Sequence, residues 1–181
     1  MFPERTEQLA LVNPIGLENW KALGVSYRTV DENYAQELKT TPESIREYER
    51  MSYFGGQWKP RYALIEIPAG WSKDPDYPIM AWNSRTDVEH DLHAAGSLRV
   101  STVATRTLLI IGQRDRTAFA GGASGNVRAT LGNYPVLGRA AARAFQHAKR
   151  VEIANVGHLP QIEAFDRYSQ ALLGSVTSEE G

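Results

Sequence analysis

A buried run of apolar residues with an acid close behind it constrains the fold of this chain more than any other feature. Residues 108–111 are Leu-Leu-Ile-Ile, Gly112 ends the run, and Asp115 follows three residues later. A continuous apolar run bounded by a turn signal is typical of a strand buried on both faces, in a parallel sheet between helices. Parallel sheets place ligands and catalytic groups beyond the carboxyl ends of their strands. The run therefore predicts such a sheet, and Asp115 stands where function usually begins.

Other segments supply the remaining strands and helices. Residues 9–13 are a short apolar run that Pro14 stops, because proline cannot donate to a strand ladder, and they predict a second buried strand. After the run at 108–111 the patterns predict, in order, a long loop, a helix, a strand, a turn and an amphipathic helix: 116–133, 135–147, 150–155, 157–160 and 161–176. This alternation indicates a parallel α/β arrangement.

The segment 17–100 differs in character, because it is rich in Tyr, Trp, Glu and Arg with scattered Pro. Residues 31–52 predict two helical pieces, the second with Thr41 as N-cap and Pro42 at its first position. Residues 57–82 predict an irregular or short-helical region. We therefore divide the chain into a first core strand and turn (1–16), an inserted, mainly helical cap (17–100) and a C-terminal core (101–181).

Composition excludes several classes of protein. With 181 residues the chain has room for one domain, or a small domain with an insertion. A formal net charge of −1 and the lack of a polybasic tract argue against nucleic acid or an acidic membrane surface as partner. The sequence has no Cys, which excludes disulfides, thiolate metal sites and a Cys nucleophile. We expect no membrane span and no N-terminal signal core, so a soluble, by default cytoplasmic protein, with the compartment left open.

Two residues of catalytic type follow two successive predicted strands. Asp115 comes after the first of them and His158 after the second. Both loops would leave the same edge of a parallel sheet, so the two side chains would lie a few ångströms apart if the strands are neighbours. An acid that orients a neutral histidine, which then acts as general base, is the second half of a catalytic triad. The alternatives are a turn-forming Asp and an exposed loop His.

Three stretches resemble parts of the α/β-hydrolase fold. Residues 108–117 (LLIIGQRDRT) resemble its acid-bearing strand and turn, and residues 155–163 (NVGHLPQIE) resemble its catalytic-histidine loop, with Glu163 at the usual acidic place. Residues 9–18 (LALVNPIGLE) resemble the strand after the nucleophile helix and its turn into a cap. The resemblance covers essentially the whole chain. It implies three parallel strands with flanking helices, hydrolysis of an ester or similar bond of a small molecule, and catalytic roles for Asp115 and His158.

The nucleophile of that family is absent from this chain. Its G-x-S-x-G turn would lie ahead of residue 9, where only eight residues stand. Ser124 lies in Gly-Ala-Ser-Gly within the loop after Asp115 and reads as a loop serine, because no strand precedes it. We therefore expect the C-terminal half of a hydrolase, inactive alone, with either a Ser nucleophile for esters or an Asp nucleophile for epoxides or haloalkanes. The alternative is an inactive pseudo-hydrolase that binds a complementing half or forms a homo-oligomer.

No cofactor or metal is expected. His90 and His93 lie one helical turn apart and could ligate a metal, but no third ligand is evident nearby, so we expect a solvated helix or turn there. The Trp and Tyr residues of 53–82 either line a pocket for a small-molecule substrate or pack the cap.

Overall fold

A computed structural model describes residues 3–94, 100–118 and 123–177, with the side chains of Pro3, Ala63 and residues 87–94 outside the description. The strands are β1 (Gln8–Val12), β2 (Arg106–Gly112) and β3 (Ala148–Ile153). The α-helices are α1 (Val30–Glu37), α2 (Pro42–Tyr48), α3 (Glu66–Trp71), α4 (Tyr77–Ala94), α5 (Gly125–Arg128), α6 (Tyr134–Ala144), α7 (Pro160–Glu163) and α8 (Phe165–Val176). Short 3-10 helices are η1 (Pro3–Arg5), η3 (Ala63–Ile65) and η4 (Val100–Thr102), and η2 (Glu49–Tyr53) is a π-helix.

The three strands form one parallel sheet, as the sequence predicted, and their order is β1-β2-β3. The prediction that the first strand covers 9–13 and is buried is wrong, because β1 covers 8–12 at the edge of this sheet and none of its residues is buried. Val12 of β1 pairs with Ile110 of β2, and Gly112 of β2 pairs with Ile153 of β3. The three carboxyl ends therefore meet at one edge of the sheet. The loops that carry Asp115 and His158 both leave from this edge, because they follow β2 and β3.

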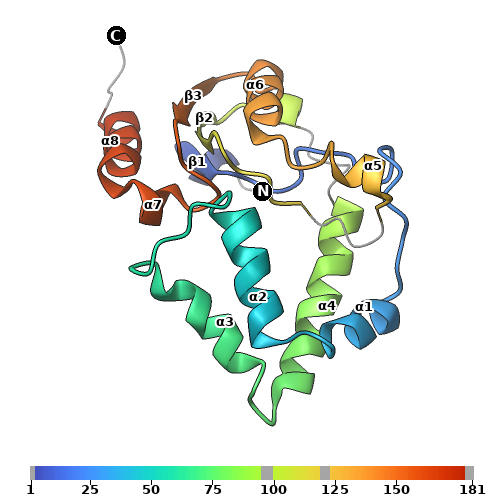
Figure 1. Ribbon diagram of the computed structural model, residues 1–181. Coiled ribbons are helices and arrows are strands. Elements are labelled where there is room, and N and C mark those ends of the chain that lie inside the picture. The colour runs from blue at the N-terminus through green and yellow to red at the C-terminus, as the bar shows by residue number, and fades with distance from the viewer. Residues whose placement is uncertain (1–2, 95–99, 119–122, 178–181) are drawn as a thin grey trace.

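Strand β2 is buried on both faces because a helix covers each one. Leu108 and Ile110 belong to a cluster that includes Tyr168 and Leu172 of α8. Leu109 points to the other face, where it packs with Ala141 and other residues of α6. Figure 1 shows α6 and α8 on opposite sides of the sheet. From Leu108 to Ile111 the run is at most 3% exposed, so the prediction of a doubly buried central strand is confirmed.

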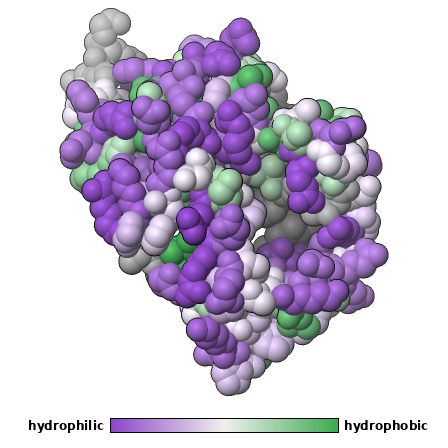
Figure 2. Space-filling view, in the orientation of Figure 1, coloured by the Kyte–Doolittle hydropathy of each residue, from purple (hydrophilic) through white to green (hydrophobic). Residues whose placement is uncertain are grey.

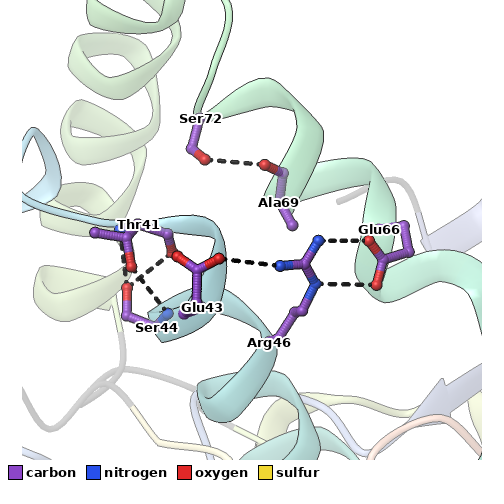
Figure 3. Close-up of polar contacts among 7 residues, drawn as sticks. All are labelled: Thr41, Glu43, Ser44, Arg46, Glu66, Ala69 and Ser72. Carbon is purple, nitrogen blue, oxygen red and sulfur yellow. Dashed lines mark hydrogen bonds and ion pairs between the residues drawn. The ribbon is translucent and has the colours of Figure 1, made fainter.

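Helices α1 to α4 lie together on one side of the sheet, in the lower half of Figure 1. Thr41 caps α2 as predicted: its hydroxyl accepts from the Ser44 amide at 3.2 Å, and the Ser44 hydroxyl accepts from the Thr41 amide at 2.9 Å. This reciprocal pair satisfies two amides that a helix start leaves open. Arg46 then joins α2 to α3 through two hydrogen bonds to Glu66, at 3.0 and 2.8 Å (Figure 3).

Helix α1 is fastened to α4 by polar and aromatic contacts. The Tyr77 hydroxyl donates to the Glu37 carboxylate at 2.6 Å. The rings of Tyr34 and Trp82 meet edge to face, with centroids 5.3 Å apart. These contacts hold α1 and α4 as a pair, beside which α2 and α3 pack on each other.

Several predicted element bounds are wrong. The last strand runs over 148–153, not 150–155, because its pairing with β2 begins at Ala148 and Asn155 turns out of the ladder with a φ of 60°. The predicted helix 135–147 ends at Ala144, where Phe145 takes an extended ψ of 146°. The predicted helix 161–176 is broken into α7 and α8 at Ala164, whose φ is −149°.

Two loop predictions also need correction. Residues 57–82 were expected to be irregular or short-helical, but the 18-residue helix α4 begins at Tyr77. Its first residues are held by Asp74 and Asp76, whose carbonyls accept from the amides of Tyr77 and Met80. The predicted loop 116–133 contains the single-turn helix α5, and residues 119–122 of that loop lie outside the described part. Among the described residues, no helix is long and apolar enough to cross a membrane.

Candidate active site

Asp115 and His158 meet at the carboxyl edge of the sheet. Asp115 is fully buried, and its Oδ2 lies 2.7 Å from Nδ1 of His158. The other carboxylate oxygen, Oδ1, accepts from the amide of Thr117 at 2.8 Å. With one oxygen held by the backbone, the carboxylate has a fixed direction toward the ring. A proton on Nδ1 would be donated to Asp115, which leaves Nε2 as the ring nitrogen that can accept a proton.

The main chain of His158 is held by η2, a segment far from it in the sequence. Its amide donates to the carbonyl of Tyr53, at the end of the π-helix η2, over 2.6 Å. The Tyr53 ring meets the imidazole edge-on, with centroids 4.9 Å apart, and the Tyr134 ring lies at 6.1 Å. The His158 side chain is 17% exposed to solvent. Asp115, Tyr53 and Tyr134 therefore hold the imidazole ring in one orientation, and the side chain remains partly accessible to solvent.

The residue before His158 has no room for a side chain. A Cβ added to Gly157 would lie 2.1 Å from the Tyr53 carbonyl oxygen. The Gly157 amide donates to Oε1 of Glu163 at 2.7 Å, so the first turn of the following helix holds this loop. Glycine here lets η2 approach the histidine loop closely enough to bond to it.

Arg114, next to the acid, links the same parts of the molecule. Its Nη1 donates to the carbonyls of Phe54 and Gly55 at 2.7 and 3.2 Å. Its Nη2 donates to the Asn155 carbonyl at 2.8 Å and pairs with Oε2 of Glu163 at 2.8 Å. Burial raises the pKa of Glu163, although the ion pair with Arg114 and the bond from Gly157 oppose that shift. Arg114 therefore ties η2, the acid turn and the histidine loop into one unit.

The phenols around His158 are kept in their neutral form. Burial raises the pKa of Tyr53 to about 12, and the nearby Tyr48, Glu49 and Asp115 add to this. Burial also raises the pKa of Tyr134, and Asp115 is its second cause. These rings make a weakly polar wall, in which the contact between Asp115 and His158 is less screened than it would be in water.

A cavity of about 560 Å³ lies among helices α1 to α4 and η2. It is lined by Val25, Ser26, Arg28 and Ala118 and by parts of α1, α2, α3, α4 and η2. Asp115 and His158 are not among its lining residues, but Tyr53 is, and the Tyr53 ring contacts the His158 ring. Arg28, Glu37 and Arg85 are among its polar lining residues, and Ile45, Trp71 and Met80 are among its apolar ones. Figure 2 shows a mainly hydrophilic surface that is hollowed in this region. The volume is in the range of small-molecule sites.

Comparison with solved structures identifies the fold. The chain resembles a probable hydrolytic enzyme from Pseudomonas aeruginosa PAO1, with 39% identity and a TM-score of 0.92 over 98% of this chain and 57% of that one. The chain has part of the α/β-hydrolase fold. The match confirms the fold class and the partial α/β-hydrolase fold that the sequence motifs suggested.

More distant α/β-hydrolases share the fold alone. The 2-hydroxy-6-oxo-6-phenylhexa-2,4-dienoate hydrolase from Rhodococcus sp. strain RHA1 is 14% identical, with a TM-score of 0.66 over 97% of this chain and 57% of that one. A meta-cleavage product hydrolase from Pseudomonas fluorescens IP01 is 18% identical, with a TM-score of 0.53 over 96% and 56%. This α/β-hydrolase chain thus spans between half and two thirds of the length of these relatives. No model of a known protein family and no curated protein matches it.

The other candidate residues do not join the pair. Ser124 directly precedes α5, and its side chain makes no capping hydrogen bond there. The side chains of His90 and His93 lie outside the described residues. Within the described part of the chain, no group of three or more His, Cys, Asp or Glu residues could hold a metal ion.

Three residues that support the pair were not singled out by the sequence reasoning. Asn13, Tyr53 and Arg114 each bond to the main chain of the acid turn, the histidine loop or both. Asn13 lies in the stretch 9–18 and Arg114 in the stretch 108–117, both of which resemble the α/β-hydrolase fold. A polar residue at or just after the end of a predicted strand in such a stretch could have indicated a supporting role. Tyr53 acts through its carbonyl and its ring, and the π-helix that positions it leaves no pattern in the sequence that separates it from an ordinary helix end.

Proposed function

We propose that this chain supplies the acid and the histidine of a hydrolase that cleaves an ester or a similar bond in a small molecule. The observation that carries the proposal is the 2.7 Å contact between the buried Asp115 and Nδ1 of His158, at the carboxyl edge of the sheet. The 39% identity to a probable hydrolytic enzyme supports it. The cavity beside Tyr53 supports a small molecule as substrate.

In the proposed reaction, Asp115 and His158 work in two steps. Nε2 of His158 takes the proton of a serine hydroxyl as that oxygen attacks the carbonyl carbon, and then gives it to the leaving alcohol. It next takes a proton from water, which attacks the acyl group and frees the acid, and the proton returns to the serine. Asp115 keeps the ring in the Nδ1–H tautomer and stabilises the imidazolium that forms in each step.

The nucleophile in this proposal comes from outside residues 1–181. Among the described residues no serine follows a strand in a strand–turn–helix arrangement, and Ser124 precedes only the single turn of α5. With an aspartate nucleophile in place of the serine, and with His158 activating water, the same arrangement of Asp115 and His158 would hydrolyse an epoxide or a haloalkane. A panel of a p-nitrophenyl ester, an epoxide and a haloalkane separates these reactions.

A second candidate function is that of a complementing half, and one observation favours it. Strand β1 has the sequence QLALV, yet none of its residues is buried, whereas nearly all of β2 is. β1 is at the edge of the sheet in the described part of the chain, and an apolar edge strand offers a surface to which another strand can pair. The partner would be a segment that carries the nucleophile, or another copy of this chain.

The test joins or co-expresses this chain with the part of the Pseudomonas aeruginosa relative that it does not cover. The joined protein should hydrolyse p-nitrophenyl acetate, and His158→Ala should remove that activity while Ser124→Ala keeps it. Residual activity in His158→Ala equal to the parent would exclude the proposed role. Loss in Ser124→Ala would instead make Ser124 the nucleophile. The chain alone, run in parallel, reports whether the added part is needed.

A further inference from the structure

Asn13 is a buried polar residue that the proposed reaction does not use. It directly follows β1 and is only 2% exposed. Its φ of 41° lies in the left-handed region, which few residues other than glycine and asparagine adopt readily. A buried amide of this kind costs free energy unless its donors and acceptor are bonded.

The side chain of Asn13 bonds to the segments of both the acid and the histidine. Its Oδ1 accepts from the amide of Gly112, the last residue of β2, at 2.8 Å. Its Nδ2 donates to the carbonyls of Gly157 and His158, at 3.2 and 2.9 Å. Both amide protons and the carbonyl oxygen are therefore engaged, and a single side chain connects the end of β1, the end of β2 and the loop after β3.

These bonds complete a clamp on the peptide groups of His158. The His158 amide donates to the Tyr53 carbonyl, and the His158 carbonyl accepts from Asn13. The other anchor of Asn13, Gly112, stands three residues before Asp115 on a turn that closes with a bond from the Asp115 amide to the Gly112 carbonyl. One short side chain thus connects the start of the turn that carries Asp115 to the backbone of His158.

We infer that Asn13 is a positioning residue, which holds the backbone of His158 at the distance where Nδ1 bonds to Asp115. This inference deepens the proposed function and rests on it for its relevance to catalysis. Asparagine suits the place because it supplies both an acceptor and a two-proton donor in the left-handed conformation. Aspartate would set an oxygen against two carbonyl oxygens, and glycine would keep the backbone but lose all three bonds.

The experiment records the imidazole nitrogen and Nδ1-proton NMR signals of His158 in the full chain. The parent should show the Nδ1–H tautomer and a far-downfield proton from the bond to Asp115. Asn13→Asp and Asn13→Gly should lose that proton signal and show mixed tautomers. The matched control is Asn155→Gly, which changes an exposed asparagine that also has a positive φ, of 60°, and should retain the parent signals. Parent-like signals in both Asn13 variants would overturn the inference.

A measurement on the unaltered chain keeps the inference testable if both Asn13 variants unfold. The side-chain amide protons of Asn13 should exchange with solvent roughly 100-fold more slowly than those of the exposed Asn19. Equal exchange would show that the bonds to Gly157 and His158 do not form, and would overturn the inference. Both readouts are independent of turnover, so an inactive protein with an ordered His158 would refute the proposed function and leave the role of Asn13 intact.

Discussion

Gly112→Ala should separate the acid from the histidine through a single added methyl group. Gly112 ends β2, and a Cβ built there would lie 1.9 Å from the Gly157 carbonyl oxygen and 2.9 Å from that of Val156. Ordinary contact begins near 3.4 Å, so the peptide after Gly157 must move by about 1.5 Å. Both contacts are with backbone, and no flexible side chain can yield in their place.

The expected losses of stability and of activity depend on which groups are displaced. Overpacking of a dense interior usually costs about 1–3 kcal/mol of unfolding free energy, and contact with fixed backbone puts this case at the upper end. The displaced peptide is the one that leads into His158, whose ring lies 2.7 Å from Asp115. A shift of that size carries the pair beyond hydrogen-bond distance, and misplacement by about 1 Å costs on the order of 100-fold in rate where the pair catalyses.

Urea unfolding and the His158 NMR signals measure the two effects. We expect Gly112→Ala to lose about 3 kcal/mol and the signal of the Nδ1 proton together. The matched control is Gly174→Ala in α8, where an added Cβ meets nothing within 4 Å. There the loss of backbone freedom in the unfolded chain should raise stability by about 0.5–1 kcal/mol. A Gly112→Ala variant as stable as the parent, with its Nδ1 proton signal unchanged, would show that the close packing of Gly112 against the Gly157 carbonyl does not position His158.

Three further substitutions test other parts of the structure. Thr41→Ala removes the N-cap of α2 and should cost about 1 kcal/mol, seen as a fall of roughly 2–4 °C in Tm; an unchanged Tm would show that the capping box adds nothing. Arg114→Ala leaves Glu163, whose side chain is 3% exposed, without its cation, and should lower the free energy of unfolding in urea by about 3 kcal/mol. A double variant with Glu163→Gln should recover part of this loss. No recovery would mean that the loss does not come from the unpaired carboxylate. Burial raises the pKa of Glu49 in the folded protein. The folded protein is therefore most stable below the ordinary Glu pKa, where Glu49 is protonated, and it loses this stability as the pH rises through the raised pKa. Glu49→Gln should therefore match the parent in Tm near pH 4 and exceed it above about pH 6, and a difference that does not grow with pH would contradict the cause assigned here.

The part of the fold that sequence predicted best is the part that local chemistry dictates. Four apolar residues at 108–111 leave little choice but a strand buried on both faces, and Asp115 and His158 then follow neighbouring strands. Thr41 and Pro42 signal a helix start through bonds within four residues. In each case the decisive interactions lie close along the chain or repeat along a strand.

The part that sequence did not predict depends on contacts between distant segments. Asn13 and His158 are 145 residues apart, and no pattern near either one specifies the bond between them. Tyr53 matters through a carbonyl that every residue has, at a place that only the fold brings to His158. Strand β3 begins at Ala148 because β2 offers a partner there, which the polar residues Lys149 and Arg150 do not suggest.

In the proposed function, Asp115 orients His158 for hydrolysis. The most direct test of this role is kcat/KM for p-nitrophenyl acetate in this chain joined to the uncovered part of the Pseudomonas aeruginosa relative, compared with its Asp115→Asn variant. Asparagine keeps the size of the side chain, but it favours the wrong ring tautomer and cannot stabilise the imidazolium. We predict a loss of about 10³–10⁴-fold with the fold retained. Activity within about threefold of the parent, well short of that loss, would contradict the account.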